Sequence, residues 1–202
     1  MLTTICRLYD AYADANRAVL LLEVSGVPPS GTSLISNNCD AWFRGPARPN
    51  VVPLRRQRES SDAGIRTEST AIGATAATAG LVTILAVPGI GPVVGTGWLA
   101  TMLSIIAIGG VTGGLPGVLT NAGINEVDAQ LFVEVVRRGG TLVTTRMPQE
   151  DVSRIAAQMN RGAVNLAERS ELYRKAGWLS FDPKAPPYTA DQVRCERALH
   201  AR

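Results

Sequence analysis

Residues 86–98 read AVPGIGPVVGTGW, a run in which four glycines and two prolines stand among valine and isoleucine. Such a run is either a loop that binds phosphate through its backbone or a turn between two hydrophobic segments. The spacing of Gly89, Gly91 and Gly95 is GxGxxxG, which differs from the dinucleotide-binding GxGxxG, and no acidic residue follows before Glu126. The sequence therefore predicts a turn, and its residues are Pro88, Gly89, Gly91 and Pro92.

This turn lies inside a long segment without charge. Residues 69–125, 57 in all, contain no acidic, basic or histidine side chain, and they hold 12 of the 20 glycines. On either side of the turn, residues 70–87 and 93–115 would measure about 27 and 35 Å as helices, against about 30 Å for the hydrocarbon core of a bilayer. We therefore expect residues 70–124 to form a glycine-rich helical hairpin that inserts into a membrane.

Small residues recur at helical spacing in both halves of this segment. That spacing allows two helix backbones to approach closely in lipid, although it would serve equally in a hairpin buried inside a soluble oligomer. Both interpretations predict a homo-oligomer. The expected packing residues are Gly73, Ala77, Gly80, Gly109, Gly113 and Gly117.

Basic residues stand on the flank of the uncharged segment. Residues 39–69 are rich in proline and arginine and are expected to form a linker, whereas the predicted turn carries no charge. The positive-inside rule then places the protein in the inner membrane with both termini in the cytoplasm; a hairpin buried in an oligomer would instead be cytoplasmic. No aromatic residues alternate with the arginines, so we expect no nucleic-acid partner. The predicted contacts with membrane lipid are Arg55, Arg56, Arg58 and Arg66.

The two ends of the chain each show a strand–helix–strand pattern. The first half, residues 1–38, has strands at 3–9 and 32–38 and a helix that we expect to begin at Asp10 and end at Gly26. The second half, residues 125–170, begins with a helix at 126–138 and continues with a strand at 141–146, a helix from Pro148 to Gly162 and a strand at 163–168. Each central helix has an apolar stripe at i, i+3, i+4 and i+7, formed by Ala15, Ala18, Val19 and Leu22 and by Val152, Ile155, Ala156 and Met159.

These two units predict an α+β fold. We expect a ferredoxin-like, four-stranded antiparallel sheet with helices on one face, interrupted by the uncharged hairpin. Residues 171–202 would then form a tail. From Gly177 it is expected to begin as extended, proline-rich chain and to end as a short helix, and Trp178, Phe181 and Tyr188 would hold it to the domain.

The sequence shows no constellation for catalysis. We recognise no nucleophile–base set, metal cluster or cofactor motif, so we expect a protein that is not an enzyme. His200, the only histidine, is expected to be a solvated residue of the tail, and Cys6 to fill the core. Cys39 and Cys195 are expected to be partly exposed, which leaves a thiol-based redox activity as a third possibility.

Four stretches resemble the bacterial general stress protein family, whose members are also described as low-temperature-induced or heat-induced. They are LYDAYADANRAVLLLEVSGVP (8–28), AVPGIGPVVGTGWLA (86–100), VRRGGTLVTTR (136–146) and GWLSFDPKAPPYT (177–189). The resemblance implies two βαβ halves around a glycine-rich hydrophobic segment, a role in stress and a membrane location, but no catalytic residue.

Two functional hypotheses follow. The first is a non-enzymatic stress-associated protein that anchors a small cytoplasmic domain to the membrane through the hairpin. The alternative is a soluble oligomeric sensor of small molecules, with the hairpin buried in the core of the oligomer.

Overall fold

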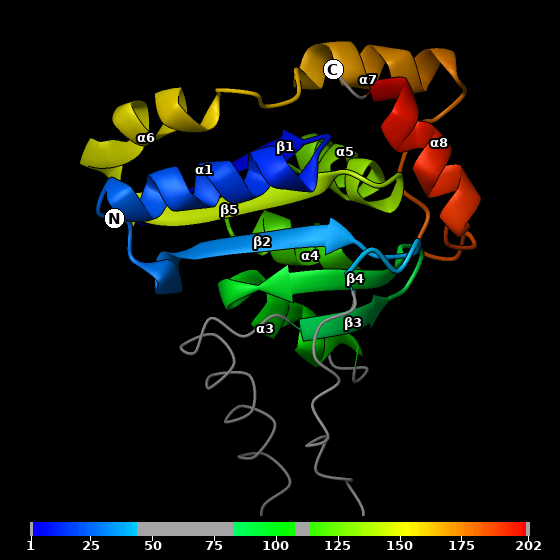
Figure 1. Cartoon of the computed structure of the whole chain (residues 1–202), viewed down its shortest axis with the longest axis horizontal. Helices are drawn as coiled ribbons and strands as arrows, with labels where there is room; N and C mark the ends of the chain where they lie inside the picture. Colours follow the sequence, from blue (N-terminus) through cyan, green and yellow to red (C-terminus); the bar gives the residue numbers. More distant parts are fainter. Residues whose placement is uncertain (1, 44–82, 108–113, 201–202) are drawn as a thin grey trace, which may run out of the picture.

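The protein has an α+β fold, in which helices cover both faces of a five-stranded antiparallel sheet (Figure 1). The computed structural model describes residues 2–43, 83–107 and 114–200. The strand sequences are rich in β-branched residues, as in TSLISN of β2 and TLVTTRMP of β5. The strands are β1 (Leu2–Tyr9), β2 (Thr32–Asn37), β3 (Thr83–Val87), β4 (Gly91–Thr96) and β5 (Thr141–Pro148).

The order of the strands differs from the predicted ferredoxin-like sheet. Strand β5 lies between β1 and β2 and is antiparallel to both, so β1 and β2 run in the same direction. They are joined by α1 (Tyr12–Val24), as predicted, and Gly26 follows the helix with a φ of +87°. Strands β4 and β3 then extend the sheet beyond β2, giving the order β1-β5-β2-β4-β3. The four-stranded sheet was wrong because the prediction assigned no strand to the uncharged segment.

The predicted closing strand at residues 163–168 is also wrong. Among the described residues, this segment meets the sheet through a backbone hydrogen bond, in which the N–H of Val164 donates to the carbonyl of Leu8 at 2.8 Å. The side chain of Asn165 accepts from the N–H groups of Ala167 and Glu168 and so begins α7 (Leu166–Lys175). Asparagine is a favoured N-cap and the LAERSELYRK that follows is rich in good helix formers, which explains the outcome.

The described part of the uncharged segment begins with a β-hairpin and continues with two helices, contrary to the predicted helical hairpin. Residues 88–90 make the turn between β3 and β4, while Gly91 and Pro92 belong to β4. The predicted second helix at 93–115 is divided among the end of β4, α3 (Gly97–Ala107) and the start of α4 (Gly114–Asn121). Short strands that are buried in a sheet have the same continuous apolar pattern as a buried helix, so periodicity could not distinguish them.

Gly97 is the residue at which β4 turns into α3. Its φ is +76°, and a Cβ atom there would lie 2.1 Å from the carbonyl oxygen of Thr32 on β2. Only glycine fits this close approach. Gly89, in the turn, has a comparable constraint, because a Cβ atom would lie 2.9 Å from both the ring of Phe181 and the Cα atom of Pro183. The tail therefore packs on the β3–β4 turn.

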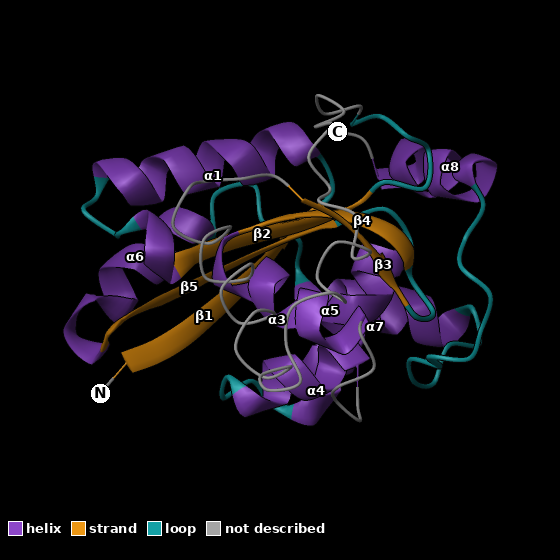
Figure 2. Cartoon of the chain, turned by 90° about the horizontal axis from the view of Figure 1, so that it is seen from below, coloured by secondary structure: helices purple, strands orange, loops and turns teal. Residues whose placement is uncertain are grey.

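Each face of the sheet has its own core (Figure 2). On one face, α1 and α6 (Val152–Met159) bury Ala15, Leu22 and Ile155. In the predicted stripes Ala18 and Met159 are buried too, and Val19, Val152 and Ala156 are partly buried. The other face is covered by α3, α4 and α5 (Glu126–Arg137), whose buried residues include Leu99, Leu103, Leu119, Phe132 and Val136.

The tail is anchored by its aromatic residues and ends in a helix. Trp178 and Phe181 pack against the core of the second face, and Arg137 lies over the ring of Tyr188 at 4.9 Å. The final helix, α8 (Ala190–His200), buries Val193 against Gly139. Among the described residues, none of the helices combines the length and the apolar character needed to cross a bilayer.

Candidate ligand-binding pocket

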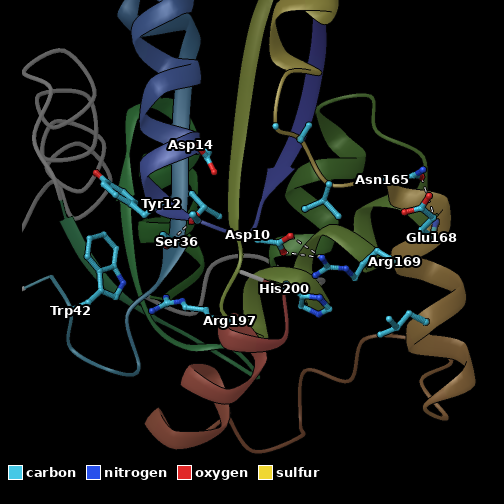
Figure 3. Close-up of a pocket in the computed structure, with 16 residues that line it drawn as sticks. Asp10, Tyr12, Asp14, Ser36, Trp42, Asn165, Glu168, Arg169, Arg197 and His200 are labelled. Atoms are coloured by element: carbon cyan, nitrogen blue, oxygen red, sulfur yellow. Dashed lines mark hydrogen bonds and ion pairs between the residues drawn. The ribbon is translucent and has the colours of Figure 1, made fainter. Parts of the chain in front are cut away.

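A pocket of about 610 Å³ lies at the end of the sheet where β1 stops (Figure 3). Its walls come from the start of α1, from β2 and β5, from the loop before α7, and from α7 and α8. Its volume falls within the range of roughly 300–1,000 Å³ that is usual for small-molecule sites. The residues that matter for its chemistry are Asp10, Tyr12, Asp14, Ser36, Trp42, Thr141, Glu168, Arg169, Arg197 and His200.

An ion pair between Asp10 and Arg169 forms one side of the pocket. Both carboxylate oxygens of Asp10 accept from Nη2 of Arg169, at 2.9 and 3.0 Å. Asp10 was predicted to cap α1, but the N-cap is Ala11, which makes no side-chain hydrogen bond. Arg169 is only 8% exposed. Burial alone would lower the pKa of Arg169, but the neighbouring Tyr173 and Asp10 raise it, so the guanidinium remains charged.

Arg197 joins α8 to the body of the protein. Its guanidinium donates to the carbonyl oxygens of Gly139 and Asn37, each at 2.8 Å, and to the carboxylate of Asp40. Burial lowers the pKa of Arg197, although Asp40 opposes that shift. Three acceptors, from the end of β2, from the loop that follows it and from the turn after α5, therefore hold this wall of the pocket in place.

His200 lies on the same wall, and the prediction of a solvated tail residue was wrong. Its side chain is only 16% exposed, and its Nε2 atom is 3.8 Å from a carboxylate oxygen of Glu196. Burial lowers the pKa of His200, and the positive charge of Arg169 lowers it further. The imidazole is therefore neutral near pH 7. No local pattern in the sequence indicates this burial, because His200 is brought into the pocket by the docking of α8.

Two buried hydroxyl groups line the pocket between these charged groups and the aromatic side. Ser36 on β2 and Thr141 on β5 are paired across the sheet, and their hydroxyl oxygens are 2.9 Å apart. Both side chains are buried. Since one of the two hydroxyl protons is sufficient for this bond, the pair retains a second proton that a ligand oxygen or nitrogen can accept.

Tyr12 and Trp42 form the opposite, aromatic side of the pocket (Figure 3). Their ring centroids are 4.4 Å apart and the rings are inclined at 49°. The indole Nε1 of Trp42 donates to the carbonyl of Asn37 at 2.7 Å, which fixes the ring. The pocket therefore combines a rigid apolar surface with several charged groups, the combination that is typical of small-molecule sites.

The residues singled out in the sequence lie elsewhere. Pro88, Gly89, Gly91 and Pro92 are in the β3–β4 hairpin, and Gly117 is in α4. The other predicted packing and lipid-contact residues fall outside the described part of the chain: Gly73, Ala77, Gly80, Gly109, Gly113, Arg55, Arg56, Arg58 and Arg66. The sequence analysis missed the pocket, for which the one local signal was the cluster of polar and aromatic residues directly after the first strand.

The three cysteines do not line this pocket. Cys6 is buried, as predicted, and burial raises its pKa to about 12. Cys39 is partly buried, which raises its pKa as well. Cys195 is exposed. A raised pKa reduces the fraction of reactive thiolate, so the geometry does not favour a redox role for Cys6 or Cys39.

Comparison with known proteins adds no relative, since nothing matches the chain among family models, curated proteins or solved structures. The pocket is therefore interpreted from its own geometry.

Proposed function

We propose that this protein is a non-enzymatic sensor that binds a small molecule in the pocket at the end of β1. The observation that carries the proposal is the construction of the pocket. A pocket of about 610 Å³ is lined by segments far apart in the chain, which bring charged groups and the Tyr12–Trp42 pair together. A sensor needs such a site and an element that responds to occupancy.

Helix α8 supplies the responding element. It contributes Arg197 and His200 to the pocket, and it is held by Val193 and by the hydrogen bonds of Arg197. A ligand that contacts both α8 and the N-terminus of α1 therefore favours the state in which α8 is docked. Binding and docking of α8 are then coupled through the same free energy.

The proposal is tested by thermal denaturation of the full chain with a panel of soluble metabolites that vary in charge and aromatic content. A binder of the native state raises Tm, and above its Kd the stabilisation grows with the logarithm of the ligand concentration. The same panel is run on Trp42→Ala, which removes the aromatic side, and on Arg154→Ala, a control on the exposed Arg154–Asp151 pair outside the pocket. We expect at least one compound to stabilise the native chain and the control but not Trp42→Ala, each compared with its own ligand-free Tm.

Equal stabilisation of Trp42→Ala would show that the compound binds outside this pocket. A panel without any stabilising compound would contradict a sensor of soluble small molecules.

Membrane attachment and a role in stress remain predictions from the sequence. The observation that favours attachment is the uncharged run of residues 69–125 behind a basic flank. Residues 83–87 and 91–96 of this run form strands, so an anchor would have to use the part of the run outside the described residues.

Alkaline carbonate washing of membranes tests this attachment. An integral anchor leaves the tagged chain in the pellet, and deletion of residues 70–82 releases it. Recovery of the intact chain in the supernatant as a defined oligomer would contradict an anchor and agree with the sensor proposal.

A further inference from the structure

We infer that the molecule bound in this pocket carries a positively charged amine on an aromatic or apolar skeleton. This inference names the ligand class of the proposed sensor and rests on that proposal. It follows from which charged groups of the pocket are already neutralised by the protein and which are not.

The cationic side chains that line the pocket have acceptors within the protein. Arg169 is paired with both oxygens of Asp10. Arg197 is paired with Asp40 and with two backbone carbonyls. His200 is neutral near pH 7. An anionic ligand would therefore have to compete with Asp10 and Asp40 for the guanidinium groups of the pocket.

The remaining carboxylates of the lining are less well neutralised. Asp14 pairs only with Arg17, whose side chain is 72% exposed, and such a surface pair contributes about 0–1 kcal/mol because water and salt screen it. Glu168 is exposed and forms no ion pair with another described residue. The charge available to a ligand is therefore negative.

The aromatic pair and the Asp14 carboxylate line the same pocket on either side of the start of α1. Tyr12 and Asp14 both belong to the first turn of this helix, where their side chains leave it on different sides, and Trp42 packs on Tyr12 (Figure 3). An aromatic face attracts a cation through its ring quadrupole, and a nearby carboxylate adds to that attraction. Glu168 lies on the opposite side of the pocket, on α7. A ligand whose amine lies at Asp14 would therefore extend its skeleton across the start of α1 to reach Tyr12 and Trp42.

Both carboxylates also occupy the first turn of a helix, where a negative charge stabilises the helix dipole. That role acts on the folded chain with or without a ligand. A binding measurement that compares ligands of opposite charge separates the two roles.

The test uses phenethylamine and phenylacetate, which share a phenyl ring and a short chain but carry opposite charges at pH 7. Each is titrated into the full chain by isothermal calorimetry. For fragments of this size we expect phenethylamine to bind with a Kd of about 1 mM and phenylacetate about tenfold more weakly or not at all. Asp14→Asn should weaken phenethylamine about three- to tenfold, while Asp151→Asn, on an exposed pair outside the pocket, should leave its Kd unchanged.

Tighter binding of phenylacetate would overturn the inference that the ligand is an amine. It would agree with the proposed pocket, but as a site for an anion. Equal binding of phenethylamine and phenylacetate, or an unchanged Kd in Asp14→Asn, would show that the site does not distinguish ligands by their charge. Either result would also overturn the inference. Binding of neither would overturn it as well, and the metabolite panel decides separately whether the pocket is a ligand site.

Discussion

At the scale of single residues, Asp10 and Arg169 connect the end of β1 with α7. Replacing Asp10 by Asn leaves the guanidinium of Arg169 buried without its carboxylate. Loss of one partner of a buried pair costs about 3–5 kcal/mol, and the partial exposure of Asp10 reduces this. We expect Asp10→Asn to lower the free energy of unfolding by about 2 kcal/mol in urea denaturation at pH 7.

The control for this variant is Asp151→Asn. Asp151 also pairs with an arginine, Arg154, but both side chains are largely solvated. Its loss should cost less than about 1 kcal/mol. Equal costs for the two variants would contradict a structural role for the Asp10–Arg169 pair.

His200 makes stability depend on pH. Because its pKa is lowered in the folded chain, the unfolded chain binds a proton first as the pH falls. The contribution of His200 to stability is therefore complete above the unfolded pKa of about 6.5 and is lost as the pH falls below it, by up to about 1.4 kcal/mol per pH unit. We expect Tm to fall between pH 7.5 and pH 5.5, and to fall less in His200→Gln.

His200 is the only histidine, so the difference between the two chains isolates its titration. Identical pH dependence in wild type and His200→Gln would show that the imidazole titrates in the folded chain as it does in the unfolded chain.

At the scale of elements, Gly97 distinguishes the observed β-hairpin from the predicted helix. A Cβ atom at Gly97 would meet the carbonyl of Thr32, and the φ of +76° disfavours any other residue. We expect Gly97→Ala to lower the free energy of unfolding by about 3 kcal/mol or more, the range of strong backbone and overpacking effects. In a helix spanning residues 93–115 the same change would instead stabilise the chain by about 0.5–1 kcal/mol. Chemical denaturation shows whether Gly97→Ala lowers or raises the free energy of unfolding, and so which of the two structures forms.

Gly26→Ala is the matched comparison for this variant. Gly26 also has a positive φ, +87°, but no atom lies within 4 Å of the position of a Cβ atom. The cost there should be about 1–2 kcal/mol, which is the backbone strain alone. The excess in Gly97→Ala then measures the close approach of the β4–α3 junction to β2.

The elements that the sequence could predict have local signals. Helix α1 has an apolar stripe and ends before Gly26, α5 ends before Gly139, and β1 and β5 are rich in β-branched residues. Residues 83–96 have no such signal, because a buried strand and a buried helix share one apolar pattern. Residues 163–168 were misassigned because the N-cap at Asn165 was not recognised.

Apart from the polar and aromatic residues directly after the first strand, local pattern does not indicate the pocket. Asp10 and Arg169 are 159 positions apart, and Asp40 and Arg197 are 157 apart. These pairs form only when the strand order brings the end of β1 beside α7 and when α8 docks on Gly139. Each residue alone is an ordinary charged side chain, so the chemistry of the pocket is a property of the tertiary fold.

At the scale of the whole molecule, ligand binding and the docking of α8 should respond together. Hydrogen exchange of α8 measures this coupling, since local opening exposes its amides. We expect a compound that raises Tm to slow exchange in α8 of the wild type, and Arg197→Ala to speed it in the ligand-free chain. Unchanged exchange in α8 at a saturating concentration of the compound would leave the pocket without the proposed responding element.

The most direct test of the central claim is chemical-shift mapping of the ¹⁵N-labelled full chain with the compound that raises Tm most. The pocket predicts that the largest changes fall on the amides of Tyr12, Trp42, Gly162 and His200, which line it from four separate segments of the chain. Changes confined to other surfaces, such as the exposed Leu20 and Val24 of α1, would contradict the assignment of the ligand site to this pocket.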